Sequence, residues 1–336
     1  GVPAVGALAG CKGSGEVPAR VDIHHHAMPA PVRSWLVTRG FLPPVGGPPF
    51  ARWSRGDALN TMDEYNIQLA VVSAAIPDAF TPTPADALEL ARITNDSLAE
   101  LVKDRPDRFG VFAFIPLSDI DGALAEIARG YDELAVDGVL LMAHTGATYL
   151  GDPVLEPVMA ELDRRRAVIL VHPYNLPGAA ETAIPAFVAD FFADTTRAAM
   201  QLVHNGVLDR YRSIRWILAH GGGYFPYQAS RLVLGQGLGY GVDRTAVSRA
   251  LSRFYVDTAA PMSPYSTPTL MSTIGRDRIL YGSDYNAVPA ETVGAALDEF
   301  LVDPALGDDD RRRIARDNAL ALLPAIAARL AGKVSG

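Results

Sequence analysis

The sequence predicts an α/β protein built as a single (β/α)8 barrel, the TIM-barrel fold. Eight short apolar segments alternate with segments that have the spacing of amphipathic helices. Some of the apolar segments are uninterrupted, as at residues 139–142 and 168–171, which is typical of parallel strands covered on both faces. No glycine-rich dinucleotide-binding motif follows the first strand, and this weakens the alternative of an open doubly wound sheet.

The order of the elements follows from these periodicities. We expect strands at residues 20–26, 68–74, 109–116, 138–143, 167–173, 214–221, 253–259 and 278–284. We expect helices at residues 57–65, 85–103, 121–134, 153–166, 184–204, 225–234, 265–274 and 308–330. A Pro- and Gly-rich loop insertion at about 29–55 follows the first strand and holds a short helix at 31–39. Long loops of this kind often cover functional sites.

Composition narrows the class of protein. The 336 residues are 49% hydrophobic, enough to bury the core of one barrel domain at residues 20–332. The net charge of -8 and the absence of a basic run argue against nucleic acid as a partner. The sequence contains no stretch of 18 or more uninterrupted apolar residues, so no transmembrane segment is expected. The single cysteine, Cys11, allows neither an internal disulfide nor a thiolate cluster, so a metal would need histidine and carboxylate ligands.

Residues 1–19 differ from the rest and are expected to form an extension and linker. Leu8-Ala9-Gly10-Cys11 resembles the lipobox of bacterial lipoproteins, in which the cysteine is lipidated. Two interpretations stay open: a trimmed signal with a lipid anchor at Cys11 on an exported protein, or a simple extension of a cytoplasmic protein.

A histidine triplet ends the first expected strand. Because side chains alternate along a strand, we expect Asp22, His24 and His26 on one face, and Ile23 and His25 on the other. Two imidazoles two residues apart on one face can bind one metal ion. We therefore expect His25 to pack against the surrounding helices.

Other strands also end in side chains that can bind metal, at the barrel edge where catalysis takes place in this fold. The fifth, sixth and eighth end with His172, His220 and Asp284. Together with the first strand they supply the predicted metal ligands His24, His26, His172 and Asp284, a nitrogen-rich set suited to zinc, with manganese as a second choice.

The remaining histidines are assigned by position. We expect His220 to act as a catalytic acid or base, with Asp284 as its carboxylate partner and a second catalytic group. His144 follows the fourth strand, where lining the pocket and lying in a surface loop are equally compatible with the sequence. His204 lies on a helix and is not expected to take part in chemistry.

Several motifs carry a resemblance to a known family. VDIHHHAMP, VILVHP, WILAHGGGYFPY, LYGSDY and the closing DNALALL resemble the amidohydrolase-related (amidohydrolase 2) family, over about residues 20 to 325. The chain is most similar to its aminocarboxymuconate-semialdehyde and 6-methylsalicylate decarboxylase group. The resemblance implies a barrel of the metal-dependent hydrolase superfamily type, one metal at the four predicted ligands, His220 as acid or base, and a homodimer.

The expected reaction is non-oxidative decarboxylation of a small aromatic or unsaturated carboxylic acid, without an organic cofactor. The alternative is hydrolysis of a lactone, ester or amide at the same site. A non-catalytic barrel whose metal only stabilises the fold is disfavoured, because all five metal-competent residues are present. The residues expected to contact the substrate are Arg52, Trp53, Arg55, Tyr174 and Tyr285. Phe192 is expected in the core.

Overall fold

The computed structural model describes residues 19–180, 182–259 and 262–332. Within these ranges eight parallel strands form one sheet in the order β1-β2-β3-β4-β7-β8-β9-β10. The strands are β1 (Arg20–His26), β2 (Ile67–Ser73), β3 (Phe109–Phe114), β4 (Gly138–Met142), β7 (Val168–His172), β8 (Arg215–Leu218), β9 (Tyr255–Asp257) and β10 (Ile279–Leu280). A short hairpin of β5 (His144–Thr145) and β6 (Thr148–Tyr149) follows β4.

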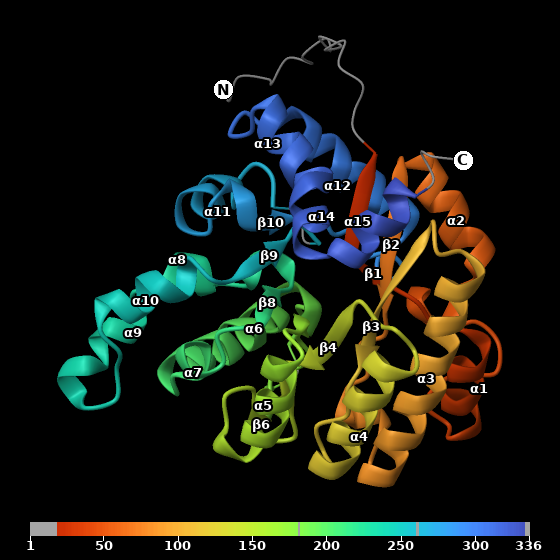
Figure 1. Ribbon diagram of the computed structural model, residues 1–336, viewed down its shortest axis with the longest axis horizontal. Coiled ribbons are helices and arrows are strands. Elements are labelled where there is room, and N and C mark those ends of the chain that lie inside the picture. Colours follow the sequence, from red (N-terminus) through yellow and green to blue (C-terminus); the bar gives the residue numbers. More distant parts are fainter. Residues whose placement is uncertain (1–18, 181, 260–261, 333–336) are drawn as a thin grey trace.

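The sheet closes between its first and last strands. The backbone N–H of Ile23 donates to Tyr281 O at 3.0 Å, and the N–H of Asp284 donates to His24 O at 3.0 Å. The helices lie around the strands, while the segment from α8 to α10 extends away from them (Figure 1). The predicted (β/α)8 barrel is therefore confirmed.

The barrel has an inner and an outer apolar core. Alternate residues of the same strand divide between them: Leu140 and Met142 of β4 pack inside, whereas Val139 and Leu141 pack against the helices. The inner core is closed at the amino-terminal ends of the strands by side chains such as Leu323 and Ile326. Burial on both faces explains why these strands are continuously apolar.

The helical layer contains most of the helices predicted from sequence. The predicted helices found in it are α1 (Ala30–Thr38), α2 (Arg55–Glu64), α3 (Pro84–Asp104), α4 (Ile120–Asp132), α5 (Glu156–Arg164), α6 (Ala186–His204) and α11 (Thr267–Thr273). Ser54, Thr83 and Asp119 cap α2, α3 and α4 by accepting a backbone N–H three residues later. The short helix predicted within the loop insertion is α1, and a 3-10 turn at Pro49–Arg52 follows it.

The sequence-based prediction was wrong at four helical segments. It missed α10 (Arg244–Leu251) and α12 (Ala290–Val302), although α12 buries Val293, Leu297 and Phe300 at helical spacing. The predicted helix 225–234 is divided into α8 (Phe225–Gln228) and α9 (Arg231–Leu234). The predicted helix 308–330 is also interrupted.

A π-helical turn and a proline break this last segment. It consists of α13 (Asp308–Arg312), a π turn at Arg313–Asp317, α14 (Asn318–Leu322) and α15 (Pro324–Ala331). Leu323 leaves the helical conformation, with φ -120° and ψ 74°, because the ring of the following proline disfavours it there.

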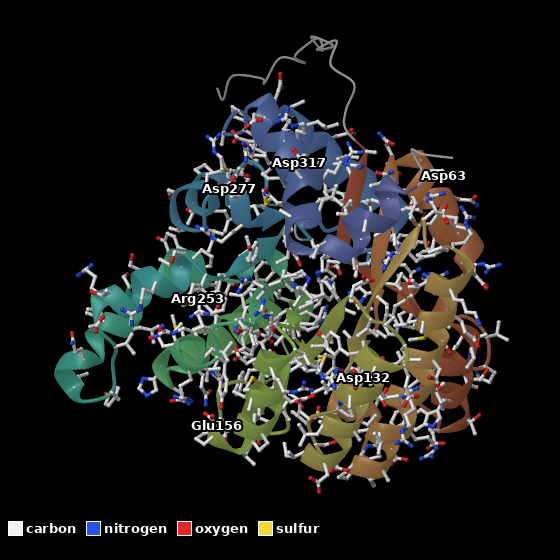
Figure 2. All side chains as sticks on the ribbon, in the orientation of Figure 1. Asp63, Asp132, Glu156, Arg253, Asp277 and Asp317 are labelled. Carbon is white, nitrogen blue, oxygen red and sulfur yellow. The ribbon has the colours of Figure 1, made fainter. Side chains whose placement is uncertain are left out.

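Charged side chains lie mainly on the outer helical layer. Figure 2 labels Asp63, Asp132 and Asp317, which pair with arginines at 2.7, 2.7 and 3.1 Å. Exposed pairs of this kind stabilise a fold by only about 0–1 kcal/mol each. The two apolar cores therefore account for most of the stability.

Two expectations concern the ends of the chain and the membrane. Cys11 and nearly all of the predicted extension 1–19 lie outside the described residues. In the part of the chain that the structure describes, no helix combines the length and apolar character needed to cross a bilayer.

Candidate metal centre and active site

Five polar side chains converge at the carboxyl ends of the barrel strands, as the sequence predicted. They come from β1 (His24 and His26), β7 (His172), the turn after β8 (His220) and the loop after β10 (Asp284). The imidazole rings of the four histidines contact one another in five pairs, whose centroids are 4.9 to 5.5 Å apart. Elements that are distant in sequence thus meet at one point inside the barrel mouth.

A β-bulge in β1 sets the direction of its side chains. Asp22 pairs with Ala70 and His25 with Val72, so two residues of β1, Ile23 and His24, lie opposite one residue of β2. The prediction of strict alternation was therefore wrong at this point.

The bulge changes which residues share a face. Val21, Ile23 and the ring of His24 all lie inward, with Val21 and Ile23 in the inner core. Asp22 lies outward with His25, and its Oδ2 is 2.9 Å from His25 Nδ1. His25 is fully buried as a packing residue, but its ring neighbour is Tyr285 in the loop after β10, with 4.9 Å between the ring centroids, rather than a helix.

Unusual backbone conformations place two of the five groups. His220 has φ 55° and Asp284 has φ 59°, in the left-handed region that non-glycine residues seldom adopt. Such residues cost about 1–3 kcal/mol each and concentrate at functional sites. After His220, Gly223 also has a positive φ, and a Cβ on it would lie 2.3 Å from Phe192 O. Glycine is therefore required where this turn contacts α6.

The polar atoms of the five side chains are close together. His24 Nε2 is 3.1 Å from His26 Nε2, and Asp284 Oδ1 is 3.0 Å from His26 Nε2. Asp284 Oδ2 is 3.5 Å from His220 Nε2. His172 Nδ1 donates to Pro173 O at 2.8 Å, which directs its Nε2 away from the backbone and toward the cluster.

Asp257 orients this cluster, and the sequence-based prediction missed it. It ends β9, is fully buried, and its Oδ2 lies 2.8 Å from His24 Nδ1. Its Oδ1 accepts the backbone N–H of His220 at 2.7 Å. A carboxylate behind a ligating histidine fixes the tautomer and the ring orientation. In the structure Val256 packs outward, so that Asp257, the next residue, lies inward.

Burial and neighbouring charges shift the pKa values of the cluster. Burial lowers the pKa of His172 well below its usual value and also lowers that of His26. Burial opposes ionisation of Asp284, but hydrogen bonds from His220 and His26 hold its pKa well below 3.8. Burial also opposes protonation of His24, yet the Asp257 carboxylate raises that pKa to about 9. Lowered pKa values keep His26 and His172 neutral beside the ionised Asp284, which are the forms that bind metals, whereas His24 must release its proton when a metal binds.

The donor set fits one divalent cation. Ligand atoms of His24, His172, His220 and Asp284 all lie within 4.8 Å of one another. Because His24 Nδ1 is engaged by Asp257, its Nε2 points at His26 Nε2, 3.1 Å away, and a cation that displaces the proton of His24 would be bound by both nitrogens. This compact group contains His220 in place of the predicted His26, although both border the same position.

The predicted substrate contacts differ in their surroundings. Arg52 and Arg55 are exposed, and Arg55 pairs with Asp104 at 3.0 Å on the surface. Trp53 is partly buried and packs with Tyr285 in a small apolar cluster. Tyr174 lies beside Phe191, with 6.0 Å between the ring centroids. Their contacts with a substrate stay predictions.

Three further residues, one phenylalanine and two histidines, differ in how far they are from the cluster and from solvent. Phe192 was expected in the core, but it is partly exposed and its ring centroid lies 6.0 Å from that of His220. His144 is buried and its Nδ1 lies 3.0 Å from Asp194 Oδ1. His204 is exposed on α6, away from these contacts.

A family model described as amidohydrolase matches residues 21–325. The chain belongs to the amidohydrolase family. The 6-methylsalicylic acid decarboxylase acuB of Aspergillus aculeatus is 31% identical over 325 residues, which cover 91% of this chain and 96% of that protein. The crystal structure of a protein described as amidohydrolase II is 26% identical in sequence. The match covers 91% of this chain and 99% of that chain, with a TM-score of 0.82.

A third relative carries a metal. It is a dihydroxybenzoic acid decarboxylase from a Polaromonas species with bound manganese and the inhibitor 2-nitroresorcinol. It is 23% identical, and the match covers 91% of this chain and 97% of that chain, with a TM-score of 0.74. At this identity the likeness supports the shared fold.

Proposed function

We propose that this amidohydrolase-family protein is a metal-dependent, non-oxidative decarboxylase of a small aromatic or unsaturated carboxylic acid. The observation that carries the proposal is the convergence of His24, His26, His172, His220 and Asp284 around one position. A 31% identical relative that decarboxylates 6-methylsalicylic acid supports the choice of reaction and of an aromatic acid.

The proposed ligands are His24, His26, His172 and Asp284, with Asp257 orienting the first of them. A divalent cation held there stabilises negative charge that develops beside the carbon that loses carbon dioxide. The nitrogen-rich ligand set favours zinc, whereas the manganese in the dihydroxybenzoic acid decarboxylase makes that metal the second candidate.

We assign the proton transfer to His220. When the bond between the carboxylate and the ring carbon breaks, its electron pair stays on that carbon and carbon dioxide leaves. Protonated His220 then delivers its Nε2 proton to the carbon, forming the new C–H bond. Asp284 Oδ2, 3.5 Å from His220 Nε2, stabilises the protonated imidazole before the transfer.

Aromatic side chains beside His220 suit a flat substrate. The ring of Phe192 lies 6.0 Å from His220 and 5.7 Å from Tyr224, with an interplanar angle of 28° to the latter. Phe191 lies 6.5 Å from the ring of His172. These apolar faces exclude water from the carbanion, which allows the proton to come from His220 alone.

The experiment compares the two reactions that the site chemistry allows. Protein loaded with zinc or manganese is incubated with hydroxybenzoates and with aromatic lactones, and both carbon dioxide release and acid release are followed. Carbon dioxide from a hydroxybenzoate, without acid from any lactone, is the expected result. Lactone hydrolysis without carbon dioxide release would replace this proposal with the hydrolase.

We also propose that the protein is a homodimer. The segment from α8 to α10 exposes large apolar side chains while extending from the barrel (Figure 1). Tyr227, Leu234, Leu238 and Tyr240 are 62 to 77% exposed. Light scattering should give twice the chain mass, and Leu238→Glu should reduce it; a monomeric wild-type protein would contradict the proposal.

A further inference from the structure

A second buried polar cluster lies beside the metal centre, and the reaction proposed above makes no use of it. It consists of His144 in β5 and Tyr149 in β6, the two strands of the hairpin after β4, and Asp194 on α6. Asp194 is fully buried. Its Oδ1 accepts the hydroxyl of Tyr149 at 2.5 Å and its Oδ2 accepts the N–H of Tyr174 at 3.0 Å.

The position of His144 directs it toward the barrel mouth. Met142 of β4 lies in register with His172, and Ala143 N donates to His172 O at 2.8 Å. Met142 packs in the inner core and Ala143 in the outer one, so His144 continues the inward alternation. Tyr174, which shares Asp194 with it, is only two residues beyond His172.

The hydrogen bonds of His144 leave one nitrogen for a ligand. Its Nδ1 lies 3.0 and 3.1 Å from the two oxygens of Asp194, so the imidazole donates from Nδ1 and its Nε2 carries a lone pair. Among the described residues no protein group forms a hydrogen bond with Nε2, and this atom is not fully enclosed by protein. The side chain keeps 5% exposure.

A metal-binding role does not fit this residue. The compact group of ligand atoms found among the described residues contains His24, His172, His220 and Asp284 but not His144. His144 instead shares Asp194 with the backbone N–H of Tyr174, the ring of Tyr174 lies beside Phe191, and Phe191 borders the ring of His172. His144 is thus connected to the aromatic side chains next to a proposed metal ligand.

We propose that His144 determines substrate specificity: its Nε2 accepts a hydrogen bond from a ring hydroxyl of the aromatic acid, and Asp194 positions it. This inference rests on the proposed decarboxylase function and narrows its substrate class to acids with a hydroxyl that is not held by the metal. A site built to bond a hydroxyl discriminates strongly against the analogue that lacks it.

His144→Asn is the informative variant. The asparagine amide occupies the place of Nδ1 and still donates to Asp194, whereas nothing replaces Nε2. His204→Asn, on the exposed side of α6, is the matched control. Asp194→Asn tests positioning, since it keeps the volume of the side chain but replaces one of the two acceptor oxygens, which face His144, Tyr149 and the Tyr174 N–H, with an NH2 donor.

The substrates are 2-hydroxybenzoate and its 2,4-, 2,5- and 2,6-dihydroxy isomers. In the wild-type protein at least one isomer should exceed 2-hydroxybenzoate by about 10- to 100-fold in kcat/KM. His144→Asn should reduce this ratio to about threefold or less, mainly through a higher KM for the hydroxylated isomer, with unchanged metal content. Asp194→Asn should reduce the ratio partly.

Calorimetric binding of the same acids separates the two proposals. If the wild-type protein binds the hydroxylated isomer selectively but releases no carbon dioxide, the reaction is wrong and the role of His144 stands. An unchanged preference in folded His144→Asn would overturn that role while leaving decarboxylation intact. Loss of metal in His144→Asn would also overturn it, because the residue would then be a ligand.

Discussion

Asp257→Asn tests whether the second layer of the site controls its metal affinity. The side chain keeps its size, and two of the three contacts can persist. Oδ1 of Asp257 accepts the backbone N–H groups of His220 at 2.7 Å and Ala259 at 3.1 Å. The amide oxygen of asparagine must therefore stay on that side, which places its NH2 group against His24 Nδ1, 2.8 Å from the present Oδ2.

This exchange reverses the tautomer of His24. An NH2 donor requires a lone pair on Nδ1, so the proton moves to Nε2, the nitrogen that the metal needs. Loss of such a partner lowers metal affinity by about 10- to 100-fold. Expressed as free energy, the expected loss is about 1.4 to 2.8 kcal/mol.

Competition with a chelator of known affinity measures this loss. Asp303→Asn is the control, because Asp303 is also a buried carboxylate but bonds the N–H of Ala305 far from the cluster. Asp303→Asn should change stability without changing metal affinity. If Asp257→Asn binds zinc within twofold of the wild-type protein, the orienting role of Asp257 is refuted.

Three other outcomes follow from the same site. His220→Asn should keep stoichiometric metal and lose turnover by about 100-fold or more; loss of metal would assign it to the ligands. In the metal-free protein the pKa of His24 is raised from 6.5 to about 9. Protonated His24 therefore contributes to the free energy of unfolding, and this contribution is fully present below pH 6.5 and is lost as the pH rises through 9. Urea unfolding should show about 3 kcal/mol of this loss, absent from His24→Gln; equal slopes in both proteins would contradict it. Gly282→Ala should cost about 1–3 kcal/mol in thermal unfolding, since its Cβ would lie 2.9 Å from His24 Cβ, whereas Gly237→Ala, with open space around it, should cost far less.

The fold and the residues of the cluster could be predicted because both depend on local patterns. Continuous apolar strands alternate with amphipathic helices, and parallel strands bring their carboxyl ends to one edge. His172 ends β7, and His220 and Asp284 lie in the loops that leave β8 and β10, so their convergence follows from topology. The division of the five groups between metal binding and acid/base chemistry stays a prediction.

The parts that were missed depend on tertiary contacts. Asp194 lies within α6 and meets His144 only because that helix packs against the hairpin of β5 and β6, a contact that no periodicity encodes. Asp257 ends a strand of three residues whose pattern is too short to show a polar inward position. The extra residue in β1 is equally invisible to an alternating pattern.

That extra residue restricts how the length of β1 can change. Below it, Val21 fills the barrel floor, and above it, His24 and His26 face the ligand position. Deleting one residue between Asp22 and His25 would restore strict alternation and turn one half of the strand inside out. The strand should therefore tolerate replacement of Ile23 by another apolar residue far better than its removal. Transfer of the His-x-His pair to another barrel would need the bulge to accompany it.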